Sequence, residues 1–147
     1  MTRFSQFAAG LAFAVAATLP TLANAVDPTD LIDYRKHVMK SLSAQAAALN
    51  MTLQGKAPAE NFAIHAETLA LVASTALMAF EPKAEGGDAK PEVWAKYDDF
   101  SKRMKEFAAG TAELAKAAKT GGAAAAQPMI QGALTCKNCH DVYRVKK

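Results

Sequence analysis

The sequence predicts an all-α protein, an antiparallel up-down-up-down bundle of four helices. Alanine is abundant, β-branched runs are missing, and apolar residues recur every three or four positions in four long stretches. Glycine and proline cluster between these stretches, where they favour turns. No segment alternates apolar and polar residues strictly, so we expect no sheet. Four stretches of about 20 residues with short connections pack as antiparallel neighbours, which gives the bundle.

The first two helices have clear end signals. We expect the first over residues 28–53, because Asp27 can cap its N-terminus and Pro28 suits the first helical position. The second spans about residues 59–80 and ends before Pro82, since the residue before a proline avoids the helical conformation. Their apolar stripes are Leu31, Val38, Leu42, Leu49 and Leu53, then Phe62, Leu69, Val72, Ala76 and Phe80.

The third helix follows the longest loop, residues 83–90, and runs over about residues 91–119 to the Gly121-Gly122 pair. The last helix begins between residues 123 and 128 and continues to about Arg144. The third stripe has heptad-like spacing, which suits packing at about 20°. It consists of Val93, Tyr97, Phe100, Met104, Phe107, Thr111 and Leu114. We assign Met51, Met78, Met104 and Met129 to the core.

The N-terminus has the organisation of a cleaved export signal over residues 1–25. Arg3 forms a positive n-region, an apolar run covers residues 7–19, and Ala23-Asn24-Ala25 is a small-residue cleavage site. The mature chain would begin at Val26. The alternative is an uncleaved membrane anchor, but the run is shorter than the about 20 residues that a spanning helix needs. We therefore expect a periplasmic protein with no membrane insertion after cleavage.

Residues 26–147 fit one domain with a single core. The whole chain has 17 basic and 14 acidic residues, and the signal contains one of the basic residues, Arg3. The mature chain therefore has a formal net charge of +2. This balance does not indicate nucleic acid as a partner. Both cysteines of this exported chain lie in one motif, so no other cysteine is left for a disulfide framework.

That motif is Cys136-Lys137-Asn138-Cys139-His140, which reads Cys-x-x-Cys-His and is typical of covalent haem attachment. Two residues between Cys136 and Cys139 let both sulfurs reach the two vinyl groups of one porphyrin. His140 then brings an imidazole nitrogen to the iron as an axial ligand. We expect one haem c per chain, held by two thioether bonds.

Other interpretations of the motif remain open at this point. A redox dithiol should lie near a βαβ pattern, and the sequence has none. A zinc site needs two further ligands, which His37 and His65 would have to supply. An ordinary disulfide is a third possibility, and a helical bundle without a cofactor is a fourth.

One face of the first helix can reach a buried haem. Arg35, Met39, Leu42 and Ala46 follow one another at steps of three and four, and Leu42 belongs to the core stripe. Met39 can therefore supply a thioether to the iron, and Arg35 can meet a haem propionate by a charge-assisted hydrogen bond. Alternatively, Met39 only packs and Arg35 is solvated. His65 is a rival for the sixth ligand position.

Residues 136–144, CKNCHDVYR, resemble the C-terminal motif of class II c-type cytochromes, the cytochrome c′ family. Tyr34-Arg35, Glu92-Val93-Trp94 and Asp98-Asp99-Phe100 resemble further segments of that family. The resemblance implies a haem-binding four-helix bundle with Arg35 near a propionate. It also implies that Met39 occupies the place of the apolar residue found in typical members, as in the low-spin cytochrome c-556 type.

The expected function is therefore periplasmic electron transfer by a low-spin haem iron with histidine and methionine ligands. The alternative is a five-coordinate cytochrome c′ that binds nitric oxide or carbon monoxide. No catalytic acid, base or nucleophile surrounds the motif in the sequence, so we do not expect an enzyme. We expect redox proteins as partners, and the resemblance makes a homodimer through the first two helices possible.

Overall fold

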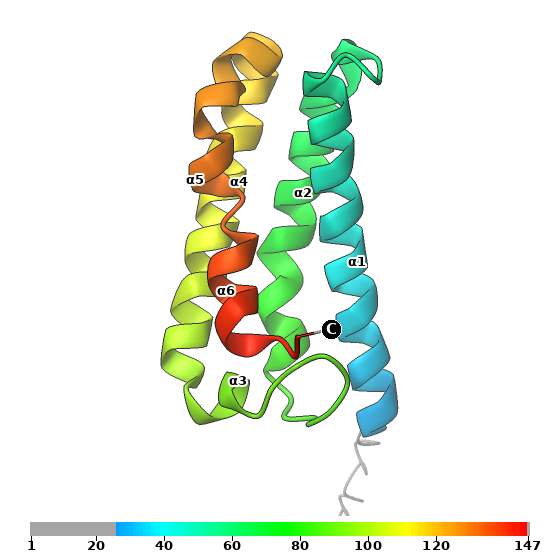
Figure 1. Cartoon of the computed structure of the whole chain (residues 1–147), viewed down its shortest axis with the longest axis vertical. Helices are drawn as coiled ribbons and strands as arrows, with labels where there is room; N and C mark the ends of the chain where they lie inside the picture. Colours follow the sequence, from blue (N-terminus) through cyan, green and yellow to red (C-terminus); the bar gives the residue numbers. More distant parts are fainter. Residues whose placement is uncertain (1–25, 147) are drawn as a thin grey trace, which may run out of the picture.

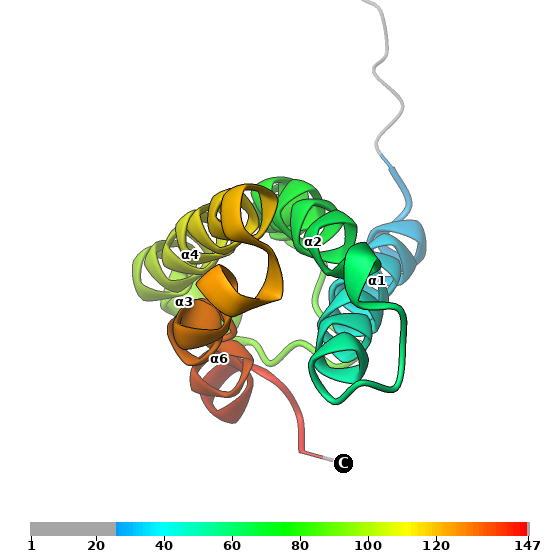
Figure 2. The ribbon, with the colours of Figure 1, turned by 90° about the horizontal axis from the view of Figure 1, so that it is seen from above.

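Long helices run side by side in the computed structural model, which describes residues 26–146 (Figure 1). Viewed from above, α1, α2, α4 and α6 follow one another around the bundle (Figure 2). The predicted four-helix bundle is confirmed, and the expected export signal lies outside the described residues. The α-helices are α1 (Pro28–Leu53), α2 (Phe62–Ala76), α3 (Glu92–Ala95), α4 (Tyr97–Ala126), α5 (Ile130–Ala133) and α6 (Cys136–Tyr143).

The first two helices have the bounds that the sequence predicts. The Asp27 side chain accepts a hydrogen bond of 2.7 Å from the backbone N–H of Thr29, which caps α1. The backbone turns after α1 at Gly55, where φ is 66°. The 3₁₀ turns η1 (Ala59–Asn61) and η2 (Leu77–Phe80) extend α2 at its two ends, so the helical path covers residues 59–80.

The third predicted helix is divided into α3 and α4. Lys96 separates the two with φ −125° and ψ 45°, so the prediction of one continuous helix from residue 91 is wrong. Neither a proline nor a glycine marks this break in the sequence. The helical path is interrupted at Gly122, where φ is 64°, although α4 as a whole runs on to Ala126. The interruption confirms the helix end predicted at Gly121-Gly122.

The last predicted helix is also interrupted, which corrects the expectation of one continuous helix. The 3₁₀ turn η3 (Gln127–Met129) leads into α5, and Leu134 then leaves the helical conformation with φ −91° and ψ 61°. α5 lies close to α4, since a Cβ atom at Gly110 would come within 3.3 Å of the Ala133 Cα atom. This contact fixes the direction of α5, and the break lets α6 take a different one.

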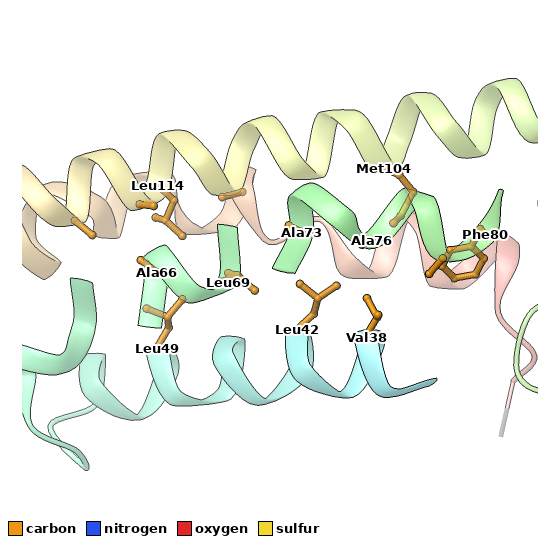
Figure 3. Close-up of a cluster of buried hydrophobic side chains, with 14 of the residues drawn as sticks. Val38, Leu42, Leu49, Ala66, Leu69, Ala73, Ala76, Phe80, Met104 and Leu114 are labelled. Atoms are coloured by element: carbon orange, nitrogen blue, oxygen red, sulfur yellow. The ribbon is translucent and has the colours of Figure 1, made fainter. Parts of the chain in front are cut away.

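The core lies between α1, α2 and α4. Figure 3 shows Leu42 and Leu49 pointing from α1 toward α2, with Met104 and Leu114 pointing inward from α4. The buried apolar side chains of this core include Val38, Leu42, Leu49, Phe62, Leu69, Phe80, Val93, Phe100, Met104 and Leu114.

The assignment of all four methionines to the core was too broad. Met104 is buried and Met129 packs against the core, whereas Met51 and Met78 are 47% and 60% exposed. Met51 lies two positions from Leu49, so its side chain leaves the buried stripe of α1. Met78 likewise lies two positions from the buried Ala76 and Phe80, so its side chain points away from them.

The loop between α2 and α3 joins the C-terminal segment. The Lys90 N–H donates to the Tyr143 carbonyl at 2.9 Å, and the Val145 N–H donates to the Asp88 carbonyl at 2.9 Å. Ala89 forms isolated bridges with Gly86 and Arg144. Residues 26–146 contain no β-strand beyond such bridges, in agreement with the predicted fold class.

Candidate haem-binding site

A cleft lies between α1 on one side and α4 with α6 on the other. It consists of two adjoining cavities of about 660 and 500 Å³, within the usual range for ligand pockets. Polar and apolar residues of α1, α4 and α6 line both cavities, with α2 and α5 contributing to the larger one and α3 and the preceding loop to the smaller one. The residues common to the two cavities are Met39, Ser43, Met104, Cys139, His140 and Arg144.

The Cys-x-x-Cys-His segment forms the first turns of α6. Cys136 is exposed, Cys139 and His140 are half-buried, and all three line the larger cavity. Cys136 and Cys139 are not joined in a disulfide. Burial raises the pKa of Cys139. Burial, assisted by the positive charge of Arg144, lowers the pKa of His140 and so favours the neutral imidazole, the form that can bind a metal.

Met39 faces this segment from α1. Its side chain is half-buried, packs against the core and lines both cavities, as His140 does. Leu42 and Ala46 continue the same face of α1 along the larger cavity. Residues that lie about one hundred positions apart in the sequence thus line the same two cavities.

Arg35 lines the smaller cavity and is only 3% exposed. Its guanidinium carbon lies 5.5 Å from the ring centroid of Phe80 and 5.2 Å from that of Trp94. The Nη2 atom donates to the Gly86 carbonyl at 3.4 Å, while the buried Nη1 atom has no hydrogen-bond partner within residues 26–146. Burial lowers the pKa of Arg35. A buried cation with an unused donor is suited to an anionic oxygen.

The two rival histidines lie elsewhere. His37 is exposed on α1. His65 Nδ1 lies 2.8 Å from Gln45 Oε1, and its side chain lines neither of the two described cavities. In the part of the chain that the structure describes, no group of three or more histidine, cysteine or acidic side chains could hold a metal ion. The zinc interpretation therefore has no ligand set there.

A polar network that the sequence did not indicate joins α4 to α6. Asp99 Oδ2 accepts hydrogen bonds from the Tyr143 hydroxyl and from Arg103 Nε, the latter at 2.8 Å. Burial, with help from Asp99, raises the pKa of Tyr143 to about 12. Hydrogen bonds from Tyr143 and Arg103 lower the pKa of Asp99. The four-residue spacing of Asp99 and Arg103 is typical of an ion pair within one helix. No local pattern indicates that Tyr143 on α6 joins them.

These residues fit a covalently attached haem. Two thiols and an imidazole come from α6, a thioether comes from α1, and the unused Nη1 donor of Arg35 matches a carboxylate. The fold and this cleft define a haem-binding four-helix bundle whose attachment motif lies on the C-terminal helix.

Comparisons with known proteins lead to the same class. A family model described as Cytochrome C′ matches residues 30–144. A cytochrome c′ of Rhodospirillum rubrum is 34% identical over 88% of this chain and 91% of its own. A cytochrome c-556 of Agrobacterium tumefaciens is 26% identical over 79% of this chain and 98% of its own. A nitric oxide complex of a variant cytochrome c prime from Alcaligenes xylosoxidans has a TM-score of 0.76 at 28% identity, covering 84% of this chain and all of the other.

The chain belongs to the cytochrome c′ family. Members of this family bind one covalent haem c per chain, which confirms the predicted cofactor. The family comprises electron-transfer and gas-binding haem proteins rather than classical enzymes. Its bacterial members are periplasmic.

Proposed function

We propose that this protein is a periplasmic electron carrier with a low-spin haem iron. Cys136 and Cys139 would hold the haem by thioether bonds, and His140 and Met39 would be the ligands of its iron. The observation that carries this proposal is that Met39 and His140 line the same two cavities from different helices. With two side chains as ligands, the iron would keep no free position for a substrate.

The bound haem supplies a one-electron change of oxidation state. The thioether of Met39 is a soft ligand that favours the reduced iron and so raises the reduction potential. The neutral imidazole of His140, favoured by its lowered pKa, keeps its lone pair available for the metal. Buried Leu42 and Met104 give the larger cavity apolar walls, which would also favour the less charged state of the iron.

Arg35 would bind a haem propionate through Nη1. The rings of Phe80 and Trp94 and the Gly86 carbonyl hold the guanidinium in the smaller cavity before any partner arrives. Preorganisation of this kind reduces the entropy lost on binding. Arg35 would thereby orient the propionate edge, while α6 fixes the thioether edge.

The optical spectrum of the reduced protein tests the ligand assignment. We expect a sharp, intense α band, and Met39→Leu should replace it with a high-spin spectrum that responds to carbon monoxide. Met104→Leu is the matched control, because Met104 lines the same two cavities from α4. A low-spin spectrum of Met39→Leu, or a high-spin spectrum of Met104→Leu, would contradict Met39 as the ligand.

A second candidate function is reversible binding of nitric oxide or carbon monoxide. The observation that favours it is the solved cytochrome c prime that holds nitric oxide and has a TM-score of 0.76 with this chain. This function requires Met39 to leave the iron free. A broad high-spin spectrum of the unmodified protein, with ready carbon monoxide binding, would favour it over electron transfer.

We also propose that α2 provides the contact in a homodimer. Ile64 and Leu71 on α2 and Met78 on the adjoining turn η2 recur every seven residues and are 62%, 70% and 60% exposed. By length and composition Ala59–Phe80 could also cross a membrane, but α2 packs between α1 and α4 in the bundle. A second copy would cover this row by the heptad packing of antiparallel helices.

Light scattering on the purified protein tests this contact. Leu71→Glu should yield monomers with an unchanged haem spectrum, whereas Ala112→Glu on the exposed side of α4 should leave the dimer intact. A monomeric unmodified protein would contradict the proposed contact.

A further inference from the structure

The helix that carries the Cys-x-x-Cys-His segment is short. α6 has eight residues, begins after the break at Leu134, and has no side-chain hydrogen bond at its N-cap residue Thr135. Isolated helices of this length are unstable in water, so packing must hold α6 in place. What fixes α6 therefore also fixes the direction of its His140 side chain.

Three residues from one face of α4 contact α6. Asp99 accepts the hydroxyl hydrogen bond of Tyr143, and the Phe100 ring packs edge-on against Tyr143 with the ring centroids 5.2 Å apart. The guanidinium carbon of Arg103 lies 5.9 Å from the centroid of the same tyrosine ring. The Arg103 Nη1 atom also donates to the Asn138 carbonyl at 3.0 Å.

These contacts hold α6 on both sides of His140 in the sequence. Asn138 precedes His140 and lies between the two cysteines. Tyr143 follows His140 by three positions, so the side chains of His140 and Tyr143 are neighbours on one helical face. Asp99 Oδ2 connects the contacts, because the same oxygen accepts from Tyr143 and from Arg103. Removal of this one carboxylate would loosen both attachments together.

We propose that Asp99 is a positioning residue for His140. Through Tyr143 and Arg103 it sets the orientation of α6 against α4, and with it the direction of the imidazole in the cavity. Asp99 itself acts only through its two partners. This inference rests on the proposed role of His140 as the iron ligand.

Asp99→Asn tests the inference, with Asp98→Asn as its control. The two carboxylates are adjacent and exposed, and the change removes one negative charge in either case, but only the Asp99 side chain bonds to Tyr143 and Arg103. We expect Asp99→Asn to shift the reduction potential and the electron paramagnetic resonance g-values of the oxidised protein more than Asp98→Asn does. Both quantities report the ligand field of the iron rather than fold stability.

Tyr143→Phe provides a second variant that keeps the ring packing against Phe100. It should reproduce the shift in g-values of Asp99→Asn, and the double variant should shift them no further than either single change, because residues of one network are not additive. Equal g-values and potentials for Asp99→Asn and Asp98→Asn, or an additive double variant, would overturn the inference even if stability falls. A high-spin unmodified protein would instead refute ligation by Met39, and the same comparison would still test Asp99.

Discussion

Replacement of Arg35 by methionine tests the propionate contact most directly. Methionine keeps an unbranched side chain between Phe80 and Trp94 but removes the charge and all donors. Without a propionate, Arg35→Met would remove one hydrogen bond from a charged donor to the Gly86 carbonyl, worth about 1.5–3 kcal/mol, together with the cation–π contacts to Phe80 and Trp94. Removal of the buried, unused Nη1 donor returns part of this amount.

The expected cost is larger if Nη1 binds a propionate. Removing one partner of a buried ion pair leaves an unpaired charge and costs about 3–5 kcal/mol. Lys36→Met is the matched control, because Lys36 is the next residue of α1 and its ion pair with Asp33 is exposed. Such a surface pair contributes about 0–1 kcal/mol.

Guanidinium unfolding of the haem-loaded protein, followed by circular dichroism, gives the free energy of unfolding. We expect Arg35→Met to lower it by several kcal/mol and Lys36→Met to change it little. A cost for Arg35→Met that does not exceed that of Lys36→Met would refute the buried pair.

Two further predictions concern packing and pH. Gly110→Ala should lower the free energy of unfolding by about 1–3 kcal/mol, because the new Cβ would meet the Ala133 backbone at 3.3 Å. Gly132→Ala is the control, since nothing lies within 4 Å of its Cβ, and it should be neutral or stabilising in the same chemical denaturation. In an alkaline titration, stability should fall between pH about 10 and about 12, since unfolded tyrosine ionises first while the folded pKa of Tyr143 is about 12. Tyr143→Phe should remove that part of the pH dependence, and an unchanged profile would contradict it.

Local end signals explain why α1 could be predicted to the residue. Asp27 and Pro28 act on their own helix terminus, so no knowledge of the rest of the fold was needed. The breaks at Lys96 and Leu134 have no such local cause, since neither is a glycine or proline. They follow from how neighbouring helices pack, which a single sequence does not display.

The candidate site divides in the same way. Steps of three and four on one helix were enough to predict that Arg35 and Met39 share a face, and both line the cleft. The contact between Asp99 and Tyr143 spans 44 positions and depends on where the break directs α6. A sequence pattern therefore predicted residues that line the cleft better than those that hold α6 in place.

The loop between α2 and α3 connects the two walls of the cleft. Its Gly86 carbonyl accepts from Arg35 on α1, and its backbone bonds to Tyr143 and Val145 at the end of α6 (Figure 1). The two walls lie on opposite sides of the cleft, so these backbone bonds join them around its end. Gly87 permits this path, since its φ is 63° and a Cβ would lie 2.9 Å from Ile32. The loop thus keeps α1 and α6 in register without closing the cleft, so that the Arg35 and His140 sides are positioned by one connected backbone.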